Sequence, residues 1–85
     1  MKIWIITIED VCDYASYYHA PLAFSKEEDA RTQLDVFKKS IQTDYKTEIG
    51  NGWVYEDGDN SAEVYKDGYY GEEHYSVVLK EIELK

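Results

Sequence analysis

Few residues in this chain have the chemistry that catalysis needs, and their surroundings do not favour it. The one cysteine, Cys12, lies next to Asp13 and close to Asp10, and negative charge disfavours the thiolate that a nucleophile requires. The two histidines, His19 and His74, are far apart in the sequence, and two imidazoles with one thiol at such spacing make a poor zinc site. We therefore expect no catalytic residue, no metal and no cofactor.

An acidic segment resembles the start of a calcium-binding loop. Asp57, Asp59 and Ser61 could supply its first three ligands. The pattern then fails, because Ala62 stands where such a loop needs glycine and Gly68 where it needs a bidentate glutamate. We interpret the segment as a hairpin turn, since Asp, Gly, Asn and Ser are the residues that turns favour.

The chain contains nine tyrosines, more than the core of so small a protein can bury. Six of them cannot all be inside: Tyr14, Tyr17, Tyr55, Tyr65, Tyr69 and Tyr70. Exposed tyrosine is rigid and amphipathic, and it is enriched in protein interfaces. Two interpretations stay open, because the same rings could pair across strands on a solvated sheet face.

The formal net charge is −9, from eighteen Asp and Glu against nine Lys and Arg. In residues 53–75 only Lys66 opposes a run of acidic side chains: Glu56, Asp57, Asp59, Glu63, Asp67, Glu72 and Glu73. Such a surface repels nucleic-acid backbones and anionic lipid, but it could steer a basic partner or imitate the phosphates of a nucleic acid. The alternative is a solvated face that keeps the protein soluble.

These features predict a non-enzymatic acidic interaction or accessory protein. Its partner would be a protein, such as a basic or nucleic-acid-binding one, with no direct contact to nucleic acid or membrane. The candidate contact residues are Tyr14, Tyr17, His19, Tyr55, Glu56, Asp57, Asp59, Glu63, Tyr65, Tyr69 and Tyr70. One rival is a small-molecule-binding protein or enzyme with a His/Tyr cleft near the first hairpin, built around His19 and His74. Another is a homodimer that pairs through an edge strand at 17–24 or 62–66.

Length and composition indicate one folded domain. A chain of 85 residues is too short to be divided into two cores, and 44% apolar residues with 15% aromatics exclude a disordered acidic segment. The apolar opening ends at Glu9 with no small-residue cleavage site after it, and no segment could span a membrane. With a single cysteine, these features predict a cytoplasmic protein.

The opening segment and the middle of the chain give the clearest structural patterns. Residues 3–8 are β-branched or aromatic throughout, which predicts a strand. Ser25 and Glu28 have the spacing of a capping box, which predicts that a helix of about 22 residues begins there. Its apolar stripe consists of Ala30, Leu34, Phe37, Ile41, Tyr45 and Ile49. That stripe should face a sheet, and the glycines near residue 50 should end the helix.

Three further strands are expected after the helix. Residues 53–56 and 62–66 are interpreted as a hairpin and 74–84 as the longest strand. The apolar residues of 74–84 change phase between Leu79 and Ile82, and we expect a bulge near Lys80 to reconcile them.

Two stretches resemble a group of small, uncharacterised bacterial and phage proteins with a ββα-plus-strand plan. They are Leu22 to Ala30, which is similar to a strand ending in Phe-Ser before a helix, and Val78 to Leu84, similar to the last strand. The resemblance implies an edge strand from Tyr17 to Phe24 with Tyr18 turned inward, after a connection at 13–16. The chain departs from that plan at 53–70, where a hairpin is added.

Together these observations predict an α+β domain over residues 1–85. The expected architecture is an antiparallel sheet of about five strands in ββαβββ order, with one long helix packed on one face. The first and last strands should be neighbours. A phage or mobile-element origin accords with the resemblance.

Overall fold

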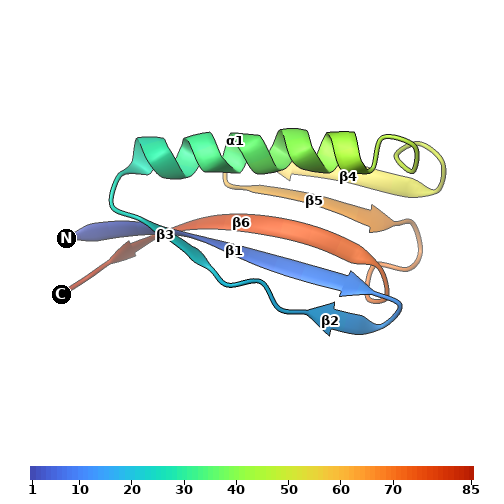
Figure 1. Cartoon of the computed structure of the whole chain (residues 1–85), viewed down its shortest axis with the longest axis horizontal. Helices are drawn as coiled ribbons and strands as arrows, with labels where there is room; N and C mark the ends of the chain where they lie inside the picture. The colour runs from blue at the N-terminus through green and yellow to red at the C-terminus, as the bar shows by residue number, and fades with distance from the viewer.

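The computed structural model describes all residues from 1 to 85 and shows one helix packed on one antiparallel sheet (Figure 1). The elements are β1 (Lys2–Cys12), β2 (Ala15–Tyr17), β3 (Leu22–Phe24), α1 (Glu27–Asp44), β4 (Trp53–Gly58), β5 (Ser61–Lys66) and β6 (His74–Glu83). The strand order is β2-β1-β6-β5-β4, and β3 pairs with the same edge of β1 as β2 does. The predicted fold class and the ββαβββ order are confirmed.

The two central strands are the first and the last in the chain, as predicted. β1 and β6 pair in one unbroken register from Lys2 opposite Glu83 to Val11 opposite His74. The bulge expected near Lys80 is therefore wrong. The change of apolar phase has another cause: Leu79 faces the helix, whereas Ile82 lies opposite Ile3 on the other face of the sheet.

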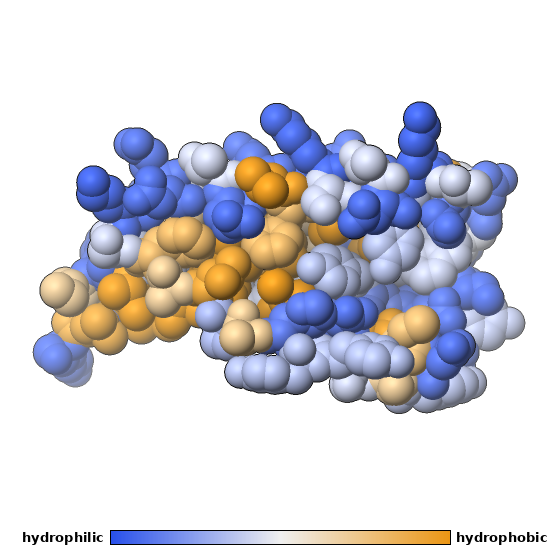
Figure 2. Space-filling view, in the orientation of Figure 1, coloured by the Kyte–Doolittle hydropathy of each residue, from blue (hydrophilic) through white to orange (hydrophobic).

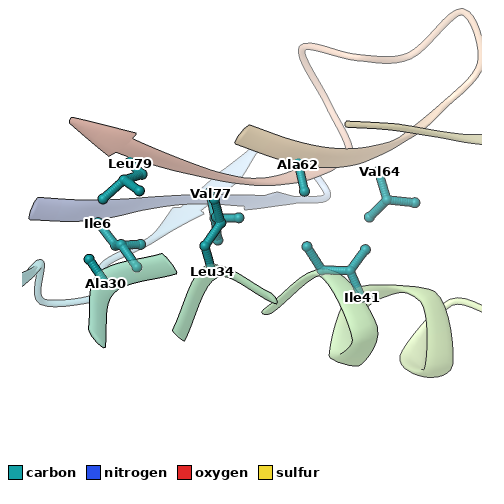
Figure 3. Packing of buried hydrophobic residues seen from close by; sticks show 8 residues of the cluster. All are labelled: Ile6, Ala30, Leu34, Ile41, Ala62, Val64, Val77 and Leu79. Atoms are coloured by element: carbon teal, nitrogen blue, oxygen red, sulfur yellow. The ribbon is translucent and has the colours of Figure 1, made fainter. Parts of the chain in front are cut away.

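The helix is held by the apolar stripe that its sequence predicts. Eight apolar side chains form the buried core: Ile6, Ala30, Leu34, Ile41, Ala62, Val64, Val77 and Leu79. In Figure 3 the three helical members of this core and the five strand members point at one another across the space between helix and sheet. Burying each of the larger ones stabilises the fold by roughly 1.5–3 kcal/mol.

Both ends of the helix differ from the prediction. The N-cap is Lys26, in an extended conformation and without a side-chain cap hydrogen bond, so the capping box of Ser25 does not form. The helix ends at Asp44, and Ile49 instead forms an isolated bridge with Trp53 that leads into β4. The helix is therefore 18 residues long. Acidic residues in its first turn still stabilise the helix, because their negative charge lies at the positive end of the helix dipole.

The predicted second strand is divided in two by a shift of register. Leu22 pairs with Ile6 in β3, whereas Tyr17 pairs with Asp10 in β2. Four residues, 18–21, therefore span three residues of β1, and one extra residue reverses which side chains face the helix. The inward position predicted for Tyr18 is wrong, because its side chain is 86% exposed.

The hairpin of β4 and β5 is confirmed, with a tighter turn than expected. Gly58 pairs with Ser61, so only two residues form the turn. Arg31 of the helix donates hydrogen bonds to the carbonyl oxygen of Asp59 (3.1 Å) and to Oδ1 of Asn60 (3.0 Å). Lys38 donates to the carbonyl oxygen of Gly58 at 2.8 Å. The helix thus fixes the turn that carries much of the acidic segment.

The sheet has one face under the helix and one face without a covering helix. We call the second one the open face, and paired residues of neighbouring strands share it. Its members are Ile3, Ile5, Thr7, Glu9 and Val11 of β1, Ser16 of β2, Ala23 of β3, Val54, Glu56 and Gly58 of β4, Ser61, Glu63 and Tyr65 of β5, and His74, Ser76, Val78, Lys80 and Ile82 of β6. The loop between β5 and β6, residues 67–73, rises on this side of the sheet in Figure 3.

Candidate functional site

Three glutamates form one row across four strands of the open face. Glu9 pairs with Ser76, Ser76 with Glu63, and Glu63 with Glu56. We call Glu9, Glu63 and Glu56 the glutamate row. Directly opposed side chains in an antiparallel sheet have Cβ atoms about 4.5–5.5 Å apart. Glu63 and Glu56 are opposed in this way, and Glu9 lies beyond Ser76 in the same line, so the row places its negative charge in a strip one residue wide. All its members line a shallow groove of about 450 Å³ together with Tyr70.

Two tyrosines hold two of these carboxylates in place. The Tyr65 hydroxyl donates to Oε1 of Glu56 at 3.0 Å, and the Tyr70 hydroxyl donates to Oε2 of Glu63 at 3.0 Å. The two rings meet edge to face with centroids 5.2 Å apart, an arrangement that aromatic pairs favour. The row is therefore ordered by neighbouring side chains.

The third carboxylate contacts the one buried polar side chain of the protein, His74, which is 5% exposed. Nε2 of His74 is hydrogen-bonded to Oε1 of Glu9. Nδ1 lies 2.5 Å from the carbonyl oxygen of Tyr70, and because a carbonyl can only accept, Nδ1 is the donor. Both ring nitrogens of His74 are therefore engaged, Nδ1 by the carbonyl oxygen of Tyr70 and Nε2 by the Glu9 side chain.

The same histidine ties the loop 67–73 to the sheet. The Tyr70 ring stacks on the His74 ring with centroids 4.3 Å apart and planes 7° from parallel. The backbone N–H of Lys66 donates to the carbonyl oxygen of Glu73 at 3.2 Å. Stacking and hydrogen bonds thus position the loop 67–73, and from this loop Tyr70 reaches Glu63.

The phenols of this site are donors. Burial, followed by the hydrogen bond to Glu63, raises the pKa of Tyr70 to about 12. The hydrogen bond to Glu56 is the main cause that raises the pKa of Tyr65. A phenol with a raised pKa stays protonated near neutral pH and cannot serve as a general base there. The two tyrosines therefore position the Glu56 and Glu63 side chains at the surface by donating hydrogen bonds to them.

Several residues predicted to share the site lie elsewhere. Tyr55 and Asp57 belong to the helix-facing side of β4, where the Tyr55 hydroxyl donates to Oδ2 of Asp57 at 3.0 Å. Asp59 lies in the turn that Arg31 holds. Of the hairpin residues, Glu56, Glu63 and Tyr65 join the glutamate row, and the structure brings Tyr70 to them.

Tyr14 and Tyr69 lie at the end of the molecule where the β1–β2 turn meets the loop 67–73. The backbone N–H of Tyr14 donates to the carbonyl oxygen of Glu72 at 3.3 Å, and the Lys66 ammonium lies 5.0 Å from the centre of the Tyr69 ring. Cys12 is exposed nearby, and desolvation, Asp13, Glu73 and Asp10 all raise the pKa of its thiol. A raised pKa disfavours the reactive thiolate.

The structure does not bring the two histidines into one cleft. His19 hydrogen-bonds through Nε2 to Oδ2 of Asp10 at 2.8 Å, and its ring meets Tyr75 edge-on at 6.1 Å. Asp10 and Tyr75 are paired on the helix-facing side of the sheet, whereas His74 belongs to the open face. Tyr17 lies on the exposed edge strand β2.

Sequence reasoning missed Glu9 and Ser76 as site residues and gave His74 a different role. Glu9 lies 54 positions before Glu63 in the chain, so no local spacing connects them. Only the pairing of β1, β6 and β5 places them in one row. The local sequence Ile8-Glu9-Asp10 gives no indication of that pairing.

No protein-family model, curated protein or solved structure matches this chain. Helix α1 lacks the apolar length that would let it cross a membrane.

Proposed function

We propose that the chain is a non-enzymatic interaction protein whose open face binds a basic protein partner through the glutamate row. The observation that carries this proposal is the placement of Glu9, Glu63 and Glu56 in one cross-strand line beside a surface groove. Glu63 and Glu56 are directly opposed, and like charges in that position repel one another. A bound cationic side chain would relieve that repulsion. A nucleic-acid-binding protein is one class of partner with such cations.

The carboxylates keep capacity for a partner. Each forms one side-chain hydrogen bond within the protein, at a single oxygen. A carboxylate has two oxygens and about four acceptor sites, so each member can still receive donors from an arginine or lysine. Glu9 is open to solvent, with its side chain 66% exposed.

The hydrogen bonds also prepare the row for binding. Ordering a long side chain at an interface costs about 0.5–1.5 kcal/mol. Tyr65, Tyr70 and His74 already order the three glutamates in the free protein. Part of that cost is therefore met during folding, which favours the glutamate row over the scattered acids of the helix as the contact surface.

The proposal extends to the cellular setting. A single cysteine suits a reducing compartment, and we place the protein in the cytoplasm. An origin in a phage or mobile element accords with the ββα-plus-strand resemblance.

The test distinguishes binding at the glutamate row from attraction by the net charge of the whole protein. A variant with Glu56→Gln and Glu63→Gln keeps side-chain size and the tyrosine acceptors. Its matched control, Glu28→Gln with Asp35→Asn, removes two exposed charges of the helix. Titration with a short arginine-rich peptide, followed by NMR, should move the amide signals of the row in the native chain.

Affinity should fall by roughly tenfold in the first variant, as expected for the loss of charged contacts worth about 1.4 kcal/mol. The control should lose much less. Equal losses in the two variants would show that only net charge acts and would refute the proposal.

A further inference from the structure

The open face has an apolar end as well as an acidic one. At the end where the termini lie, Ile3 is opposite Ile82 and Ile5 is opposite Ala23. Ile82 is 37% exposed. Figure 2 looks at the helix-covered side of the molecule, where apolar residues also gather at the end that holds the termini. We call Ile3, Ile5, Ala23, Val78 and Ile82 the apolar end of the open face; one cation, Lys80, lies among them opposite Ile5.

These residues are not explained by the core. The helix covers the opposite face, and the buried cluster contains only residues of that side. An antiparallel sheet with one solvated face normally alternates apolar and polar residues. In β1 the alternation is absent at Ile3 to Ile6 and begins at Thr7. An apolar area rimmed by polar residues is typical of an interaction surface.

We infer that the partner is an amphipathic helical segment of another protein, with basic side chains at one end and apolar side chains at the other. This inference rests on the proposed function, because the glutamate row would receive the basic end. The apolar end of the open face would receive the other. A helix on this face would add a third layer to the fold, opposite α1, as in common helix–sheet–helix architectures.

The spacing on the sheet fixes the spacing on the partner. Along β1, Ile5 and Glu9 are four residues apart, which is about 13 Å, and Ile3 is about 20 Å from Glu9. At 1.5 Å per residue, a helix covers these distances in roughly 9–13 residues. The basic and apolar groups of the partner should therefore be separated by about three helical turns.

Charge argues against a second copy of this chain on the same surface. Two copies would bring two glutamate rows and two net charges of −9 together, and like charges in contact destabilise an interface. A basic helix is complementary to the row and can cover the aliphatic side chains at the same time. Charge complementarity therefore favours a basic helix over a second copy of this chain as the partner that covers the apolar end.

Two synthetic helical peptides of equal charge test this inference. Both carry arginines at one end; one has leucines about ten residues further along and the other has alanines there. Isothermal titration calorimetry on the native chain should show that the leucine peptide binds at least about fivefold more tightly than the alanine peptide, because its aliphatic groups are buried. The variant Ile82→Thr should lose most of that advantage and bind the alanine peptide as the native chain does.

Val36→Thr is the matched control, because Val36 is an exposed aliphatic residue on the helix. It should keep the leucine advantage. Equal affinity of the two peptides for the native chain, or an advantage that persists in Ile82→Thr, would overturn the inference while leaving the glutamate-row result intact. Dimerisation of the native chain in sedimentation experiments, abolished by Ile82→Thr, would overturn it in favour of a second copy.

Discussion

Glu9 and His74 are hydrogen-bonded across the two central strands, although 65 positions separate them in the chain. This contact joins the first strand, the last strand and the loop 67–73, because His74 also bonds to the carbonyl oxygen of Tyr70. The open face is therefore organised around one buried imidazole.

Replacing His74 by glutamine should destabilise the protein by about 2 kcal/mol. Glutamine cannot reach both partners of the imidazole, and a buried acceptor left without a donor costs about 1–3 kcal/mol. Urea unfolding monitored by circular dichroism measures the change. A double-mutant cycle with Glu9→Gln should give a coupling energy of about 1 kcal/mol. A coupling near zero would mean that the two side chains act independently.

The stability contributed by Tyr70 should be lost in strong alkali. Its pKa is raised from 10 to about 12 in the folded protein, so the unfolded chain releases this proton first. The contribution is fully present below pH 10 and declines as pH rises from there toward 12. The free energy of unfolding of the native chain, minus that of Tyr70→Phe, should therefore fall over this interval. A constant difference would contradict the hydrogen bond to Glu63.

Replacing Tyr14 by glycine should stabilise the β1–β2 turn. Asp13 and Tyr14 both have positive φ, 51° and 66°, as in the two-residue turn that favours glycine at its second position. The comparison is with Tyr14→Ala, which loses the same ring but keeps the Cβ that causes the strain. The glycine variant should melt on the order of 5 °C above the alanine variant. Identical melting temperatures would show that the turn carries no backbone strain.

Removing Arg31 should loosen the β4–β5 turn. Arg31→Ala deletes the hydrogen bonds to Asp59 and Asn60, and we expect a loss of about 1 kcal/mol and faster amide exchange around residue 60. Lysine should not restore these bonds, because it lacks the planar fork of donors. Lys39→Ala, an exposed change on the same helix, serves as the control. Unaltered exchange in Arg31→Ala would contradict this role.

The elements of this fold follow from patterns that lie within one segment. The stripe from Ala30 to Ile41 repeats at the helical period, and the turn residues before Ser61 separate two strands. The errors at Tyr18 and near Lys80 occurred because pairing between strands distant in the sequence decides which face a side chain joins. The phase change at Ile82 looked like a bulge because the sequence does not state that both faces of β6 carry apolar groups.

The sequence by itself determined the composition of the site: the excess of acids, the surplus of tyrosines and the hairpin that holds Glu56 and Glu63. Tertiary structure alone decided which of these residues meet. Pairing of β1 with β6 and of β6 with β5 brings Glu9 into line with Glu63, and the loop 67–73 returns Tyr70 to the same place. The physical reason is that strand register depends on side chains far along the chain, whose packing against the helix selects one alignment. One residue of slip, as between β2 and β3, turns every side chain to the other face.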